Sequence, residues 1–85
     1  MNISKQEQRA LHVLAQGGAV LLTRDTTRKI IQADCVNRDG WHLTGFNVDL
    51  FKRLKKRRLI SSRNSRPYRI SSLGLSVVRS QMNNR

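Results

Sequence analysis

The stretch LFKRLKKRRLISSRNSRPYRISSLG, residues 50–74, interleaves cations with apolar residues at spacings that a folded segment uses. Nine of the chain's 17 Lys and Arg residues lie between Lys52 and Arg69, and no Asp or Glu lies among them. The first apolar positions recur at helical spacing and predict one buried stripe: Leu50, Phe51 and Leu54. The stretch therefore begins with a helix whose outer face is basic. Such a face most often meets phosphates or an acidic protein surface.

The same stretch then changes its hydrophobic period. Leu59 and Ile60 begin an apolar strand, residues 61–67 form a polar and basic turn, and Tyr68 and Ile70 return at period 2. We therefore expect a hairpin over residues 59–71 with a basic tip. The preceding basic helix has its own start signal, since Asn47 can cap it and Asp49 lies in its first turn.

Upstream, Ser4 and Glu7 form an S-x-x-E capping box, which predicts a helix over residues 4–16 that ends at Gly17-Gly18. Three segments rich in Val, Ile, Leu and Thr follow, at residues 19–24, 29–36 and 41–44. Turn residues separate them, including an Asp-Gly pair at residues 39–40. These segments predict a three-stranded antiparallel meander.

The chain closes with another helix, capped by Ser71 or Ser72, whose apolar face is expected to contain Leu75, Val78 and Met82. The order is thus helix, three-stranded antiparallel sheet, basic helix, wing hairpin, helix. We assign one α+β, winged-helix-like domain to residues 1–85. In a winged helix the basic helix enters the major groove of DNA and the hairpin touches the adjoining backbone. This chain departs from that pattern, because a strand and not a helix precedes Asn47.

The helix and hairpin together supply the candidate binding residues for a nucleic acid or a protein partner: Lys52, Arg53, Lys55, Lys56, Arg57, Arg63, Asn64, Arg66 and Arg69. The helix offers mainly Lys and Arg, which neutralise phosphates, and no Gln to read base edges. Binding of duplex DNA through this surface would therefore be weakly sequence-specific. Lys52, Lys55, Lys56, Arg63 and Arg66 are expected to form one continuous positive patch.

Composition argues against catalysis. The 85 residues carry a net charge of +12 but only four Asp and one Glu, which leaves little for acid–base or two-metal chemistry. His12, Cys35 and His42 would need to converge in space to form a metal or catalytic site. No phosphate-binding glycine loop or nucleophile elbow is present. We expect no enzyme activity, no cofactor and no metal; a small ribonuclease-type toxin is the minor alternative.

The four aromatic residues are more consistent with packing than with chemistry. Phe51 and Tyr68 are expected in the core. Trp41 is expected as a core or dimer-contact residue, with stacking on a base as the alternative. Phe46 precedes a helix cap, where it either packs onto that helix or is exposed.

The start of the chain, MNISKQEQR, is polar and lacks the apolar region of a signal peptide. The longest apolar run covers only residues 19–22, far short of a membrane span. A lone cysteine is consistent with a reducing compartment. We therefore expect a cytoplasmic protein without a membrane partner.

Three segments carry a resemblance to a known family: NISKQEQRALHVLAQGG at residues 2–18, LTGFNVDLFKRLKKRRLISS at 43–62, and RPYRISSLGLSVVRSQ at 66–81. They resemble the YjhX family of small bacterial proteins. The match runs over almost the whole chain and is weakest in residues 19–40. One family member is described as the toxin of a toxin–antitoxin pair, partnered by an acetyltransferase-like protein, which inhibits DNA topoisomerase I by binding it.

The resemblance implies a class of activity, but it does not identify the residues that carry it. It points to DNA topoisomerase I and an acetyltransferase-like antitoxin as partners. The alternative from the residues themselves is a winged-helix DNA-binding protein, either a transcriptional regulator or a non-specific binder. The two can overlap, since a basic module could occupy the enzyme itself or the DNA that the enzyme holds.

Overall fold

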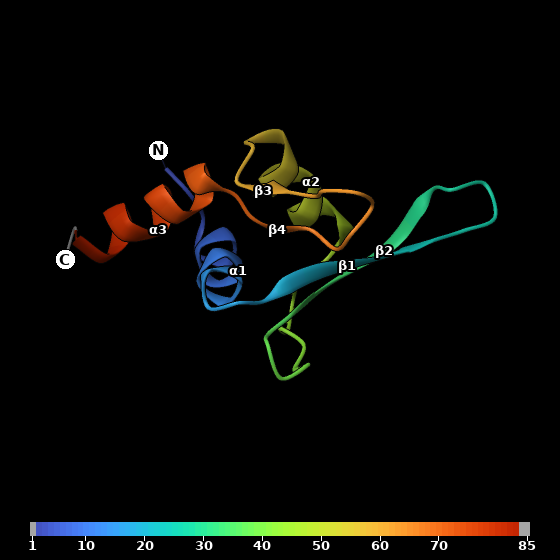
Figure 1. The fold of residues 1–85 in the computed structure, drawn as a ribbon, viewed down its shortest axis with the longest axis horizontal. Coiled ribbons are helices and arrows are strands. Elements are labelled where there is room, and N and C mark those ends of the chain that lie inside the picture. The colour runs from blue at the N-terminus through green and yellow to red at the C-terminus, as the bar shows by residue number, and fades with distance from the viewer. Residues whose placement is uncertain (1, 84–85) are drawn as a thin grey trace.

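The computed structural model describes the backbone of residues 2–83 and the side chains of residues 2–80. In this part of the chain the elements are α1 (Lys5–Ala15), β1 (Ala19–Arg24), β2 (Ile30–Val36), α2 (Val48–Lys56), β3 (Ile60–Ser61), β4 (Arg69–Ile70) and α3 (Ser72–Asn83). They form three helices and two small antiparallel sheets, which confirms the α+β class. Figure 1 shows α3 beside α1 at one end and the β1–β2 hairpin extending toward the other.

The caps of α1 are those that the sequence predicts. The Ser4 hydroxyl accepts a hydrogen bond from the Glu7 amide, and the Glu7 carboxylate accepts one from the Ser4 amide, both at 3.1 Å. At the other end Gly17 has a φ of 98°, and the amides of Gly17 and Gly18 donate to the carbonyls of Leu14 and Val13. These two hydrogen bonds form a Schellman motif, which needs a residue in the left-handed conformation just after the helix.

Strands β1 and β2 form the first hairpin, in which Ala19 pairs with Val36 and Arg24 with Ile30. Ile31, Ala33 and Cys35 alternate with polar residues along β2; Ala33 and Cys35 are buried, but Ile31 is 57% exposed. Ile31 follows Ile30, which pairs with Arg24 at the turn end of the hairpin, and this end projects beyond the helices (Figure 1). The buried face of β2 therefore has no packing partner among the described residues at the end of the strand that contains Ile31.

The expected third strand at residues 41–44 is wrong. Within the described residues this segment contributes only an isolated bridge between Val36 and His42. The Asn37 side chain accepts hydrogen bonds from the amides of Asp39 and Trp41, which curls the chain into a compact turn. Trp41 is 76% exposed, so the prediction that it belongs to the core is also wrong. Its role as a dimer contact stays a prediction.

Helix α2 begins as predicted, with the Asn47 side chain accepting from the Leu50 amide at 2.9 Å. It leads into the second hairpin, β3–β4, in which Ile60 pairs with Ile70. The return arm of this hairpin also joins β1. The Val20 amide donates to the Tyr68 carbonyl at 2.8 Å, and the Tyr68 amide donates back at 3.1 Å. This pair of hydrogen bonds holds the two hairpins side by side.

Helix α3 is capped by Ser71, whose hydroxyl accepts from the Gly74 amide at 3.0 Å. The inward face differs from the predicted one: Gly74 and Val77 are buried, Leu75 and Val78 are half-buried, and the Met82 side chain lies outside the described residues. A side chain at Gly74 would collide with the Leu59 carbonyl and the Ile70 side chain. Glycine therefore permits the close approach of α3 to the second hairpin. The face of α3 that contains Gly74 is thus turned toward this hairpin.

The core draws on every part of the fold. Its buried members come from all three helices and both hairpins: Ala10, Leu11, Leu14, Val20, Ala33, Cys35, Leu50, Phe51, Leu54, Leu59, Ile60 and Val77. As expected, Phe51 is buried, and Tyr68 packs against it edge-on with ring centroids 5.0 Å apart. Phe46 is half-buried against the same cluster. None of the helices in residues 2–83 is long and apolar enough to cross a membrane.

One buried carboxylate links α1 to α2. The Glu7 side chain is 3% exposed and lies 3.3 Å from an Arg57 guanidinium nitrogen and 3.9 Å from one of Arg53. Arg57 also donates to the Asn2 carbonyl at 2.8 Å. A buried charge is tolerated only when opposite charges and hydrogen bonds compensate it. Glu7 therefore fixes both the start of α1 and the position of α2 against it.

We predict that Glu7→Ala lowers the free energy of unfolding by about 2–4 kcal/mol, since it leaves two arginines without their buried partner and removes half of the capping box. Glu7→Gln keeps an oxygen that can accept from the Ser4 amide, so its free energy of unfolding should lie between those of the unchanged protein and Glu7→Ala. Urea unfolding followed by circular dichroism measures both.

The control for this prediction is Asp49→Asn, which removes the exposed carboxylate 3.4 Å from Arg53. Exposed ion pairs contribute little, so this change should cost less than about 1 kcal/mol. Equal losses for Glu7→Ala and Asp49→Asn would contradict the role given to Glu7.

We also predict that Cys35 is inert toward thiol reagents in the folded protein at pH 8. Burial raises the pKa of its thiol to about 11. The unfolded thiol ionises near pH 8.5, so the neutral buried thiol favours the folded state below that pH. The contribution is lost as the pH rises from about 8.5 through 11. Ellman's reagent should react only after urea is added; fast reaction of the native protein would refute the prediction.

Candidate functional site

Helix α2 sorts its side chains onto two opposite faces. With about 3.6 residues per turn, Leu50, Phe51 and Leu54 fall on the side that is buried. The opposite side presents exposed lysines, which we call the lysine face: Lys52, Lys55 and Lys56. Among the described side chains, no carboxylate forms an ion pair with any of the three. Their charge is therefore available to a partner.

Arg53 and Arg57 are not equivalent to these lysines, although the sequence groups all five together. Both side chains are 40% exposed, and both turn toward the buried Glu7 of α1. Arg53 also lies 3.4 Å from Asp49. Residues 52–69 contain no Asp or Glu, but carboxylates from outside this stretch compensate part of its positive charge. Two of its cations are used to hold the helices together.

The second hairpin presents the exposed residues Arg63, Asn64 and Arg66 at its tip. Asn64 and Ser65 have φ values of 54° and 60°, and the Arg66 amide donates to the Arg63 carbonyl at 3.0 Å. This is the pattern of a type I′ turn, in which both central residues are left-handed. The tip therefore has a defined conformation that displays an arginine on each side.

Arg69 lies on β4 and faces the end of α1. Its guanidinium is 3.3 Å from the Gly17 carbonyl and 3.5 Å from that of Gly18. These carbonyls belong to the end of the helix, where cations are favoured. Arg69 also lines a hollow of about 500 Å³ together with Arg63 and Arg66. The structure thus brings three of the predicted residues together on one side of the second hairpin.

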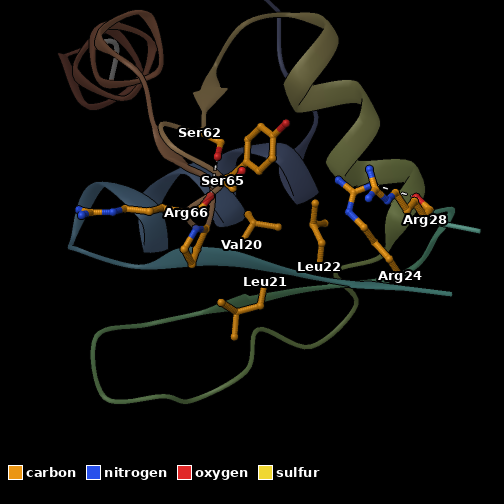
Figure 2. A pocket seen from close by; sticks show the side chains of 10 residues that line it. Val20, Leu21, Leu22, Arg24, Arg28, Ser62, Ser65 and Arg66 are labelled. Atoms are coloured by element: carbon orange, nitrogen blue, oxygen red, sulfur yellow. Dashed lines mark hydrogen bonds between the residues drawn. The ribbon is translucent and has the colours of Figure 1, made fainter. Parts of the chain in front are cut away.

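A larger groove of about 720 Å³ lies between the two hairpins. We call it the interhairpin groove; its lining residues are Val20, Leu21, Leu22, Arg24, Arg28, Ser62, Ser65, Arg66, Pro67 and Tyr68. Figure 2 shows Arg24 and Arg28 beside each other at one end and Arg66 with Ser62 and Ser65 toward the other. Val20 and Leu22 point to the same side of β1, and Leu21 points to the opposite side (Figure 2).

Arg24 and Arg28 were not among the residues predicted from the sequence. The segment TRDTTRK, residues 23–29, does carry three cations around a turn, which is a weak signal for a second basic tip. Sequence pattern alone could not show that this tip flanks the same groove as Arg66. That proximity depends on the hydrogen bonds between Val20 and Tyr68.

The other candidate residues lie apart from these basic surfaces. His12 is exposed on α1 and contacts Gln16, and His42 is exposed beside Asp34 at 3.6 Å. Cys35 is buried in β2. Within the described residues, no three His, Cys, Asp or Glu side chains are placed to hold a metal ion together.

The chain matches a protein-family model over residues 1–85; the family is YjhX, described as "Putative toxin of bacterial toxin-antitoxin pair". A UPF0386 protein of Caulobacter vibrioides is 55% identical over 85 residues, covering 100% of this chain and 93% of the relative. UPF0386 proteins of Rhizobium johnstonii and Hyphomonas neptunium are 54% and 52% identical, with 100% and 99% of both chains covered. No solved structure matches the chain significantly. The resemblance is therefore confirmed, and the chain belongs to the YjhX family.

Proposed function

We propose that this chain is a non-enzymatic toxin of a toxin–antitoxin pair that binds and inhibits DNA topoisomerase I through the lysine face and the tip of the second hairpin. The observation that carries the proposal is the lysine face itself. Lys52, Lys55 and Lys56 are exposed on one side of α2 and form no ion pair with a described carboxylate. The choice of topoisomerase I and of an acetyltransferase-like antitoxin rests on the resemblance to a family member that acts in this way.

The state of the reactive side chains favours binding over catalysis. The carboxylate of Glu7 is buried and engaged by two arginines. Burial raises the pKa of the Cys35 thiol to about 11, which keeps it protonated and unreactive at neutral pH. His12 and His42 are exposed on separate segments. Each group is thus occupied or isolated, whereas the surface cations are free to meet a partner.

A basic face suits a protein target whose surface is acidic or carries DNA, because electrostatic complementarity speeds encounter and orients the partner. A stable interface also needs apolar contact. Phe46 is half-buried against the core, so it is a poor candidate for this contact. Trp41 is a large aromatic side chain with 76% of its surface exposed, and it lies in the turn that follows β2.

Duplex DNA is the second candidate partner, by the docking mode of a winged helix. The supporting observation is that α2 leads directly into the second hairpin, whose return arm joins β1 through Val20 and Tyr68. A basic helix that runs directly into a hairpin with a basic tip suits the major groove and the adjoining phosphates. Contacts of this kind would make affinity fall steeply with salt, with a log–log slope of about −0.9 per phosphate.

The test combines plasmid relaxation by topoisomerase I with direct binding to the enzyme in the absence of DNA. We expect stoichiometric protein to inhibit relaxation and to form a complex. Replacing Lys52, Lys55 and Lys56 with Glu should weaken that complex at least about tenfold, since it reverses the charge of the contacting face. The matched control replaces Lys5, Arg9 and Arg79 with Glu, an equal charge change at exposed positions on α1 and α3, and should retain most of the activity.

Each alternative result has a defined meaning. Inhibition that disappears with excess competitor DNA, without a complex in its absence, identifies a DNA-binding protein that coats the template. No inhibition and no complex would refute the proposed function. Equal losses for the two triple variants would show that net charge matters and the lysine face does not.

A further inference from the structure

The interhairpin groove has a fixed geometry, although it is formed by two hairpins. Its centre is held by the paired hydrogen bonds between Val20 and Tyr68, at 2.8 and 3.1 Å. These backbone bonds prevent the hairpins from separating. The backbones of the two hairpins are therefore joined directly between the two ends of the groove.

The end formed by the first hairpin is an ordered turn. Arg24 donates to the Arg28 carbonyl at 3.0 Å, which holds Arg28 at a φ of 67°. Asp25 accepts from the Thr27 hydroxyl at 2.7 Å, from the Thr27 amide at 2.8 Å and from the Lys29 amide at 2.9 Å. The hydrogen bonds from Thr27 and Lys29 lower the pKa of Asp25, so the turn is braced by an ionised carboxylate. None of the ion pairs in the described part of the chain involves Arg24 or Arg28.

The end formed by the second hairpin presents Arg66 beside Ser65. The Ser62 hydroxyl donates to the Arg66 carbonyl, which ties the tip to the strand below it. Arg66 also forms no ion pair with a described carboxylate. Guanidinium groups that form no ion pair with a described carboxylate therefore stand at both ends of the groove. The carboxylate of Asp25 at the first end accepts hydrogen bonds from Thr27 and Lys29 and is not among the lining residues.

Between these ends the accessible apolar lining includes Leu22, Pro67 and Tyr68, whereas Val20 is fully buried. The Lys55 ammonium lies 5.9 Å from the centre of the Tyr68 ring, so one residue of the lysine face reaches this wall. The groove thus alternates cation, apolar surface and cation. A ligand that matches it carries anions at intervals with flat, apolar groups between them.

From this alternation we propose that the interhairpin groove binds a single strand of nucleic acid, with phosphates at Arg24, Arg28 and Arg66 and the bases or sugars against its apolar floor. Single-strand sites elsewhere combine a basic groove with aromatic surface in the same way. An acidic peptide supplies the anions without flat groups. A duplex keeps its bases stacked inside, where the floor of the groove cannot reach them. The proposal shares Arg66 with the proposed function but does not rest on it, because Arg24 and Arg28 belong neither to the lysine face nor to the tip of the second hairpin.

The test measures the binding of fluorescein-labelled oligothymidylate by anisotropy over a range of salt concentrations. With three phosphates neutralised, the log–log slope should be about −2. The variant Arg28→Gly removes one guanidinium at a backbone position that glycine adopts without strain. We expect it to weaken binding by about three- to tenfold and to reduce the slope by about 0.7. Its thermal stability should be unchanged or higher, which separates lost contacts from misfolding.

The matched control is Lys29→Ala, which removes the same charge from the neighbouring residue that does not line the groove. It should lose less than twofold in affinity. Four results would overturn the proposal. Two concern oligothymidylate: Arg28→Gly binds it as tightly as the unchanged protein, or Lys29→Ala loses as much affinity for it as Arg28→Gly does. The other two concern the ligand: Arg28→Gly loses as much affinity for a duplex of the same length, or poly-glutamate competes as effectively as unlabelled oligothymidylate. The assay with the Lys52, Lys55 and Lys56 variant distinguishes this proposal from the proposed function, because that variant should keep the sensitivity to Arg28→Gly.

Discussion

The ion pairs of Glu7 are the constraint on which the arrangement of this small protein depends. This one Glu of the chain caps α1 with its backbone and carboxylate, and the same carboxylate is buried against Arg53 and Arg57 of α2. With a net charge of +12, the helices would otherwise repel each other at their point of contact. Placing the carboxylate there turns two repelling cations into structural contacts. The lysines of α2, which this carboxylate does not engage, are exposed.

The cations of residues 52–69 therefore include some that are engaged within the protein and some that are not. Arg53, Arg57 and Arg69 are held by carboxylates or by backbone carbonyls. Lys52, Lys55 and Lys56 are not held by any described carboxylate. A lysine is a strongly hydrated point charge on a flexible stem, whereas arginine forms fixed forked contacts. On α2, the two arginines contact Glu7 of α1 and the three lysines are exposed, which agrees with this difference between the side chains.

Several short segments build the two basic surfaces, since neither hairpin is large enough to form a site alone. The hydrogen bonds between Val20 and Tyr68 place the tips of the two hairpins on either side of one groove. The Tyr68 ring packs on Phe51 of α2 and lies under Lys55. Tyr68 therefore connects the groove, the core and the lysine face.

The sequence by itself determined the features that depend on near neighbours: the caps at Ser4, Gly17 and Asn47, the buried stripe of α2, and the second hairpin with its basic tip. Hydrogen bonds and side-chain contacts over three or four residues decide these, so they can be read from spacing. Only the tertiary structure decided that Glu7 neutralises Arg53 and Arg57, that Trp41 lies outside the core, that α3 turns Gly74 and Val77 inward, and that Arg24 and Arg28 share a groove with Arg66. Each of these depends on contacts between distant segments, and no local pattern specifies which distant partner a side chain will meet.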